Sequence, residues 1–287
     1  RYNMAKLRLV NKIFVVIGIA SWLYISKQDI FIWNTSCNCT SQTHNIGIEK
    51  KSPINSIKIP TDISNVFINI GSNVDPILPP VNYASTSITI AVEPIVSFKI
   101  KKHPLLIVIP AAVSTKSGLT SMYSYNSNGE SSSLSVPSVE SWWNTGRETD
   151  GRVHLVASVT LKQMLQAMPK SVKRIPFLKT DIQGYDWSVI KDTGRDLRNF
   201  PVDYLLNEVY FEQISTYKNV SNDFCQDWLP NMRELGYELV SVDSPDKIGM
   251  SEQDAKEMCS EQKNKKSEHK ELREGNALWK RLNASSE

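Results

Sequence analysis

The side chains best suited to chemistry follow short apolar runs, where the strands of an α/β protein would end. Gly71, Ser72 and Asn73 come directly after the run Val66–Ile70, and the next apolar run is followed by Glu93. A glycine lets backbone approach a ligand closely. A carboxylate about 20 residues further on can accept hydrogen bonds from both ribose hydroxyls of a nucleoside. These residues therefore predict a nucleoside site.

The same stretch differs from a dinucleotide site. The GxGxxG glycine pattern is absent, and Pro76, Pro79 and Pro80 follow the glycine. Prolines obstruct the long helix whose N-terminus would hold a pyrophosphate. A nucleoside without a pyrophosphate fits this sequence better.

Two further carboxylates follow later apolar runs. Asp181 comes after Pro176–Thr180, and Glu208 comes shortly after Val202–Leu206. Because ligands of open α/β sheets bind beyond the carboxyl ends of the strands, we expect both side chains to face one crevice. They could act as a base, as metal ligands or as substrate anchors. No CxxC pair or Cys/His zinc spacing occurs, so no dedicated metal site is predicted.

The elements that position these residues alternate between strands and helices, which predicts a mostly parallel sheet with helices on both faces. The expected strands are 66–70, 87–92, 105–109, 176–180 and 202–206. The expected helices are 160–168, capped by Thr160, 184–191, and 223–235, ended by Gly236. Further expectations are a lid or hairpin within 118–150, a solvated helix within 251–274 and a final edge strand at 276–281.

The N-terminal part differs from this body. We expect residues 1–12 to form a basic tail, 13–33 a hydrophobic segment and 34–60 a polar stem, before a folded domain at 61–287. The uncharged run 13–25 is shorter than the about 20 residues of a full membrane span. It fits both a single-pass type II anchor and a cleaved signal peptide. The anchor reading, with a lumenal body in the Golgi or endoplasmic reticulum, is favoured over secretion.

Two other features favour a lumenal body. Acceptor tripeptides for N-glycosylation occur at Asn34, Asn38, Asn219 and Asn283. The four cysteines, which could form disulfides in an oxidising compartment, are Cys37, Cys39, Cys225 and Cys259. The preferred bridge is Cys225 with Cys259, because both fall in the folded body. Four cysteines allow three full pairings, and a buried free thiol at Cys225 is the alternative.

Composition excludes some classes of function. Hydrophobic residues make up 40% and charged residues 22% of the chain, which allows a full core. The net charge is only +3, and no basic stripe interleaved with aromatics occurs. We therefore expect no nucleic-acid partner.

Taken in order, the strand-end segments resemble FkbM-type methyltransferases. The strings are INIGSN, AVEP, PAAVS, FLKTDIQGYDWSVI and LLNEVYFE, and they span about residues 62–242. KTDIQGYD is the most specific of them. The resemblance implies a seven-stranded, Rossmann-like class I sheet with S-adenosyl-L-methionine as cofactor. It also implies O-methylation, here of a hydroxyl on a glycan or small molecule.

The resemblance further implies roles for single residues. The loop at Gly71 would face the methionine part of the cofactor, Glu93 would hold the ribose, and an alanine pair would flank the adenine. The full set of expected cofactor-binding residues is Asn69, Gly71, Ser72, Asn73, Glu93, Ala111, Ala112 and Asp181. Asp181 would lie nearest the methyl group and take the acceptor's proton, and Glu208 is the second catalytic candidate.

Two other functions compete with methyl transfer. Asn69 and Gln183 stand where the family commonly has Asp and Glu, and amides keep hydrogen bonding but lose charge. That difference favours a catalytically inactive binding or scaffold domain on the same fold. The anchor, stem and domain layout also suits a membrane-anchored glycosyltransferase. Such an enzyme would want Asp-x-Asp at a strand end, whereas the chain has Asp181-Ile182-Gln183.

Overall fold

The computed structural model describes residues 57–95, 100, 102–124, 132–136, 152–211, 217–244, 246–264 and 274–282. The basic tail, the hydrophobic segment and nearly all of the predicted stem lie outside this range, as do Cys37, Cys39, Asn34, Asn38 and Asn283. Within the described residues, no helix is long and apolar enough to cross a membrane.

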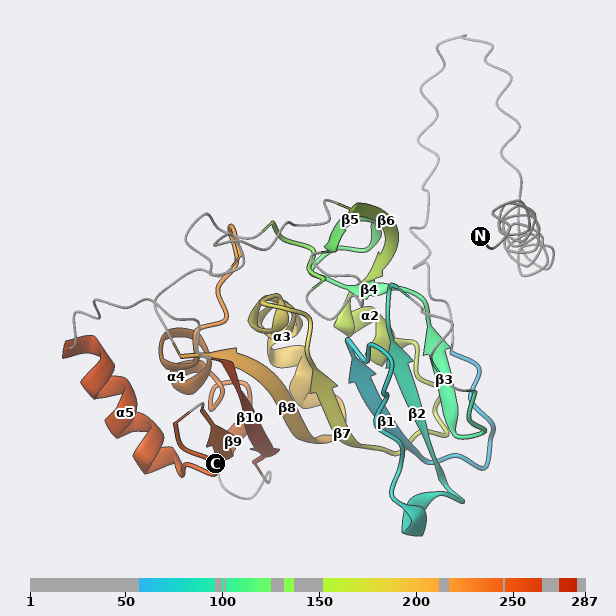
Figure 1. Cartoon of the computed structure of the whole chain (residues 1–287). Coiled ribbons are helices and arrows are strands. Elements are labelled where there is room, and N and C mark those ends of the chain that lie inside the picture. The colour runs from blue at the N-terminus through green and yellow to red at the C-terminus, as the bar shows by residue number, and fades with distance from the viewer. Residues whose placement is uncertain are drawn as a thin grey trace, which may run out of the picture. The chain divides into compact units, whose positions relative to one another are not determined.

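Seven strands form the central sheet. They are β1 (Asn65–Ile70), β2 (Ser87–Val92), β3 (Leu106–Ile109), β7 (Arg174–Thr180), β8 (Val202–Tyr210), β9 (Tyr237–Asp243) and β10 (Glu274–Arg281). Their order across the sheet is β3-β2-β1-β7-β8-β10-β9 (Figure 1). Neighbours from β3 to β8 are parallel, and β10 is antiparallel to both β8 and β9. The prediction of a mostly parallel α/β sheet is confirmed.

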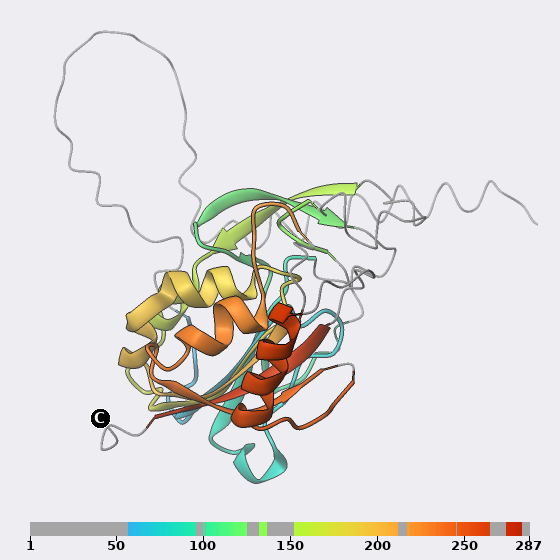
Figure 2. The ribbon, with the colours of Figure 1, turned by 90° about the vertical axis from the view of Figure 1, so that its left-hand side faces the viewer.

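A smaller sheet covers the carboxyl ends of β1, β2 and β7. Its strands are β4 (Ala112–Val113), β5 (Gly118–Ser124) and β6 (Arg152–Val159), in the order β4-β6-β5. Figure 1 and Figure 2 both show it above the large sheet. β5 pairs antiparallel with β6, a strand that the sequence pattern did not predict. The expected lid or hairpin is therefore built partly from residues beyond 150.

Helices and turns connect the strands. The helices are α2 (Leu161–Gln166), α3 (Asp186–Thr193), α4 (Leu229–Asn231) and α5 (Glu252–Asn264), and the other turns are η1 (Val81–Tyr83), η3 (Gly194–Asn199) and the π-helical turn η4 (Phe224–Trp228). Figure 1 and Figure 2 show α3 and α4 on the same side of the sheet. The described residues between β1 and β3 hold η1 but no α-helix. The expectation of helices on both faces is not met there, where the prolines after Gly71 disfavour helix.

The Thr cap predicted before the first helix is confirmed. Thr160 Oγ1 accepts a hydrogen bond from Gln163 N at 3.1 Å, and Gln163 Oε1 accepts one from Thr160 N at 3.1 Å. This reciprocal pair is a capping box, which satisfies two backbone donors that the helix itself cannot. It fixes where β6 turns into α2, and hence how the small sheet joins the large one.

Two C-terminal predictions were wrong. The continuous helix expected at 223–235 is broken into η4 and α4, because Pro230 lacks the N–H that a regular helix needs. Gly236 does end the segment, with φ of +87°. Residues 276–281 are not an edge strand: β10 lies between β8 and β9, and β9 is the edge.

The core of the body contains a cluster of tryptophan side chains from α3, η4 and β10. Trp187 and Trp228 lie with ring centroids 5.1 Å apart, and Trp228 stacks on Trp279 at 6.3 Å. Such pairs add to the stabilisation that burial provides. Ile57 is also buried in this core, and its N–H donates to Ala167 O at 3.1 Å. The folded body therefore reaches back at least to Ile57, earlier than the expected boundary at 61.

A disulfide joins Cys225 and Cys259, the pair preferred from sequence, with Cα atoms 5.4 Å apart. It ties η4 to α5, and the two cysteines are 34 positions apart in the sequence. A bridge of this loop length restricts the unfolded chain and contributes about 2–4 kcal/mol.

We predict that replacing both cysteines by alanine lowers the free energy of unfolding by about 2–4 kcal/mol. Urea denaturation of the double variant and the oxidised wild type measures the difference. Adding reductant should lower the stability of the wild type toward that of the variant and leave the variant unchanged. Equal stability of the two oxidised proteins would contradict the prediction.

Candidate functional site

A pocket opens at the carboxyl end of the large sheet, where β1 and β7 lie side by side. Its volume is about 280 Å³, near the lower end of the about 300–1,000 Å³ typical of ligand pockets. From β1 the chain continues to β2 on one side, whereas from β7 it continues to β8 on the other. Such a switch in strand order leaves a crevice in which ligands of open α/β sheets bind.

Gly71 allows β1 and β7 to come together at this point. Its φ is +70°, and a Cβ added there would lie 1.9 Å from the carbonyl oxygen of Asp181. Its N–H donates to Val92 O at 2.9 Å, which ties the loop to β2. Any side chain at position 71 would push the ends of the two central strands apart, so this glycine sets the floor of the pocket.

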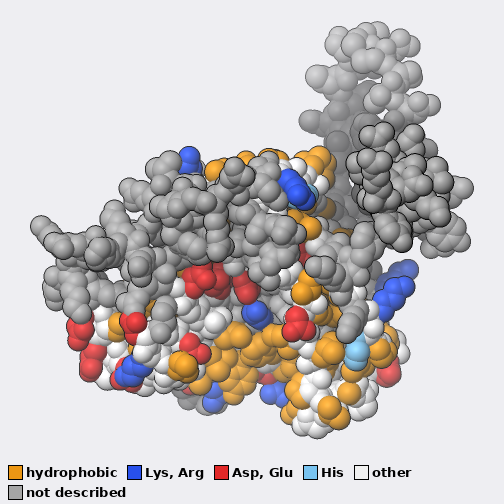
Figure 3. Space-filling model, in the orientation of Figure 1, with side chains coloured by type: hydrophobic (Ala, Val, Ile, Leu, Met, Phe, Trp, Pro, Cys, Tyr) orange, Lys and Arg blue, Asp and Glu red, His pale blue; other side chains and the backbone are white. Residues whose placement is uncertain are grey.

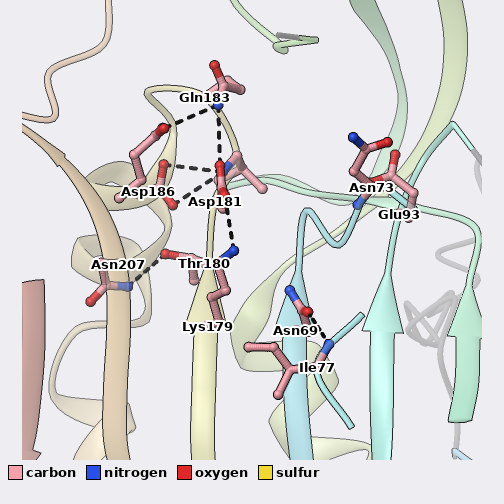
Figure 4. Close-up of polar contacts among 12 residues, drawn as sticks. Asn69, Asn73, Ile77, Glu93, Lys179, Thr180, Asp181, Gln183, Asp186 and Asn207 are labelled. Atoms are coloured by element: carbon pink, nitrogen blue, oxygen red, sulfur yellow. Dashed lines mark hydrogen bonds and ion pairs between the residues drawn. The ribbon is translucent and has the colours of Figure 1, made fainter. Parts of the chain in front are cut away.

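Glu93 is fixed by two backbone donors at the end of β2. Asn73 N donates to Oε2 at 2.9 Å, and Ile95 N donates to Oε1 at 3.0 Å. Figure 4 shows Asn73 and Glu93 next to each other on one side of the site. Burial raises the pKa of Glu93, and the two backbone hydrogen bonds oppose that rise. Each carboxylate oxygen keeps a lone pair for a ligand in the pocket.

The opposite side of the site holds two carboxyl groups, and the side-chain amide of Gln183 donates a hydrogen bond to each of them. Gln183 Nε2 donates to Asp181 Oδ1 and to Glu208 Oε1, both at 3.3 Å. Lys179 Nζ lies 3.2 Å from Asp181 Oδ2. Figure 4 shows Gln183 directly above Asp181, beyond the end of β7. The two predicted catalytic carboxylates therefore do share one wall of the pocket.

Burial raises the pKa values of two acids at and behind this wall. It raises the pKa of Glu208 well above its usual range, and the charges of Asp181 and Asp186 add to the rise. Asp186 is fully buried at the start of α3, and burial raises its pKa to about 7. Its carboxylate accepts from Ile182 N at 3.3 Å and so shapes the loop after β7.

The pocket is acidic. The ionisable residues that line it, among those the structure describes, are Glu93, Asp181 and Glu208, with no Lys, Arg or His. Figure 3 shows acidic side chains gathered on this face, where Figure 1 places the carboxyl end of β8. Charges of one sign inside a cleft favour a ligand of opposite sign. The site therefore suits a cationic or neutral ligand better than an anion.

Three of the predicted cofactor-binding residues do not line the pocket. Asn69 is buried, its Oδ1 accepts from Ile77 N at 2.9 Å, and it lies lower along β1 in Figure 4. Ser72 and Ala111 are also buried outside the lining, although Gly71, Asn73 and Ala112 next to them are part of it. Asn69 precedes the lining residue Ile70 on β1, and successive side chains of a strand point to opposite faces, which explains why Asn69 lies outside the lining.

Sequence reasoning missed several lining residues, among them Met122, Ser132 and Leu134. Met122 belongs to β5, and Ser132 and Leu134 lie between β5 and β6. All three fall within the stretch expected as a lid. Its Tyr- and Trp-containing, polar composition signalled a functional insertion but not which side chains face inward. Ser132 Oγ is buried and has no hydrogen-bond partner among the described residues, so it is available to a ligand.

A family model for the FkbM methyltransferase domain matches residues 66–239, more than half of the chain. The chain belongs to the FkbM methyltransferase family. Comparisons with curated proteins and with solved structures gave no significant match. The matched range runs from β1 into β9 and contains all of the pocket-lining residues named above. The pocket of this FkbM methyltransferase is therefore part of its family domain.

We predict that Gly71→Ala destabilises the FkbM domain more than Gly249→Ala does. Both glycines have nearly the same φ, +70° and +68°, but nothing lies within 4 Å of a Cβ at position 249. The control should therefore show only the backbone cost of about 1–2 kcal/mol. Urea denaturation of both variants measures this, and equal losses would show that the β1–β7 contact tolerates a side chain.

We predict a pH-dependent effect of Asp186→Asn. The unfolded chain loses the Asp186 proton near pH 3.8, whereas the folded protein keeps it until about pH 7. Because the folded state binds more protons within this window, wild-type stability falls there as pH rises. The variant lacks that contribution. Unfolding of both proteins from pH 4.5 to 8 should show wild type losing stability relative to the variant up to about pH 7 and levelling above it.

The exposed residue Asp62, in the turn before β1, offers a matched control. Asp62→Asn should change the pH dependence of stability much less than Asp186→Asn does. Parallel curves for Asp186→Asn and wild type would contradict the buried, protonated state of Asp186.

Proposed function

We propose that this FkbM methyltransferase transfers the methyl group of S-adenosyl-L-methionine to a hydroxyl oxygen of a glycan or small molecule. The observation that carries the proposal is the pair of facing groups at the switch point. Glu93, held by two backbone N–H groups, lies on one side, and Asp181, bridged to Glu208 through Gln183, lies on the other.

The residues of the pocket fit this cofactor. Glu93 keeps lone pairs that can accept hydrogen bonds from two ribose hydroxyls. Its position at the end of β2 is the one that the family resemblance implies. The buried, unpartnered Ser132 Oγ adds a polar contact on the small-sheet side. The acidic lining favours a molecule that carries a positive charge on sulfur.

When bound, S-adenosylmethionine would supply a methyl group attached to a positively charged sulfur. After transfer of the methyl group, the sulfur would remain in the product as a neutral thioether. Asp181 is the base in this proposal, because it lines the pocket and its carboxylate can take the proton of the acceptor hydroxyl. Gln183 Nε2 and Lys179 Nζ hold the Asp181 carboxylate in place. Fixing the reacting atoms in line can supply much of the rate enhancement, since effective molarities reach about 10⁵–10⁸ M.

The amide at Asn69 is weak support for a catalytically inactive domain. Asn69 does not line the pocket, and its oxygen holds the following loop through Ile77 N. An amide oxygen serves that role as well as a carboxylate oxygen would. Loss of a charge at this position therefore leaves the wall that faces the ligand unchanged.

The pocket also gives little support for a glycosyltransferase. Sugar nucleotides carry a diphosphate, which proteins hold with Arg, Lys, a metal ion or a helix N-terminus. The described lining residues include three acids, Glu93, Asp181 and Glu208, and no cationic side chain. An anionic donor would be repelled by this lining.

Our proposal for location is a lumenal body, with a type II anchor in the Golgi or endoplasmic reticulum and secretion as the alternative. The Cys225–Cys259 disulfide supports an oxidising compartment, since such bridges are rare in the cytosol. The glycosylation acceptor Asn219 is exposed. Glycans carry many hydroxyl groups and are abundant in that compartment. A lumenal location therefore favours them as acceptors in this proposal.

The decisive experiment measures binding of S-adenosylmethionine to the disulfide-bonded protein by calorimetry. We predict that Glu93→Gln weakens binding about 10–100-fold, because charged hydrogen bonds contribute about 1.5–3 kcal/mol each. Asp181→Asn should reduce methyl release from labelled cofactor more than it reduces affinity. Glu238→Gln, the same change on the edge strand β9, is the control and should bind like wild type.

Absence of wild-type binding at millimolar cofactor would reject the proposal. Wild-type affinity in Glu93→Gln would reject the assigned ribose contact. Binding without methyl release toward any offered glycan or small hydroxyl compound would favour the non-catalytic binding domain.

A further inference from the structure

Gln183 adopts an unusual backbone conformation in the loop between β7 and α3. Its φ is +53°, a left-handed value that residues other than glycine rarely take. Its carbonyl oxygen accepts a hydrogen bond at 2.9 Å from Ser133 Oγ, in the segment between β5 and β6. Strained conformations of this kind persist where surrounding contacts fix them, and they concentrate at functional sites.

Tyr217 holds the side chain of Gln183 from above. Its hydroxyl donates to Gln183 Oε1 at 3.2 Å. The neighbouring Gly184 makes room for the Tyr217 ring, since a Cβ there would lie 2.6 Å from Tyr217 Cδ2. Because the amide oxygen faces this donor, the amide NH₂ group must face the opposite way, toward the carboxylates.

The NH₂ group of Gln183 has two hydrogens, and each meets one acid. The partners are Asp181 Oδ1 and Glu208 Oε1, both at 3.3 Å. Figure 4 shows the Gln183 amide above Asp181, beyond the end of β7. A neutral double donor is the chemistry that lets two carboxylates share one wall. A glutamate at position 183 would remove both donors and add a third carboxyl group to the cluster.

We propose that Gln183 is a positioning residue: fixed by Tyr217 and Ser133, its amide holds Asp181 and Glu208 together at the wall where the acceptor hydroxyl must bind. This inference deepens the proposed function and rests on it for the role of Asp181. The replacement of a family glutamate by glutamine is then an adaptation to the acid pair rather than a loss of activity.

The first test needs no cofactor. Gln183→Glu places three carboxylates together, which raises their affinity for protons in the folded state only. Its stability relative to wild type should therefore fall as pH rises from 5 to 8. Gln253→Glu is the matched control, because Gln253 Nε2 also donates to a carboxylate, Glu257 Oε1 at 2.8 Å, but on the exposed surface of α5.

Urea unfolding of the three proteins at several pH values gives the readout. The proposal is supported if the stability lost relative to wild type grows with pH in Gln183→Glu and stays small in Gln253→Glu. The same small, pH-independent loss in both variants overturns it. If Gln183→Glu does not fold at any pH, Gln183→Met replaces it, since two acids without their shared donor should show the same trend more weakly.

The second test uses S-adenosylmethionine as probe. Gln183→Met should bind it about tenfold more weakly than wild type, and Tyr217→Phe about threefold more weakly, because each loosens the acid pair without changing net charge. Wild-type affinity in both variants overturns the proposal. If the wild type itself fails to bind, the proposed function fails, while the pH-dependent stability still decides the role of Gln183.

Discussion

The close contact between the ends of β1 and β7 is the constraint on which the rest of the site depends. Gly71 and the Asp181 carbonyl lie so near each other that no side chain fits between them. This contact brings the β1 loop, the end of β2 and the loop after β7 to one edge of the sheet. Glu93 and the acid pair face one pocket because these strand ends are held in register.

The strands that carry the chemistry could be predicted because their signal is local. Continuous apolar runs mark strands buried on both faces, and β1 and β2 both show this pattern. β6 and β9 could not be predicted, since their exposed residues interrupt that pattern. The internal position of β10 depends on pairing with two distant strands, which no local pattern encodes.

The site residues show the same division between local and long-range information. Glu93, Asp181 and Glu208 were expected at the pocket because each directly follows a strand or lies near its end. Ser132 was not expected, because its place depends on the pairing of Ser133 with Tyr123 across a chain reversal. Asn69 was assigned to the ligand, although the alternation of a strand turns its side chain toward the Ile77 loop.

The small sheet is inserted between β3 and β7, and it returns to the large sheet through α2. It supplies one wall of the pocket, whereas the acids and the glycine loop come from the large sheet. Substitutions at Met122 or Leu134 can therefore reshape this wall, whereas Glu93, Asp181 and Glu208 stay on the large sheet. The shape of the pocket and the placement of its acids are therefore set by different parts of the chain, one by the inserted small sheet and the other by the large sheet.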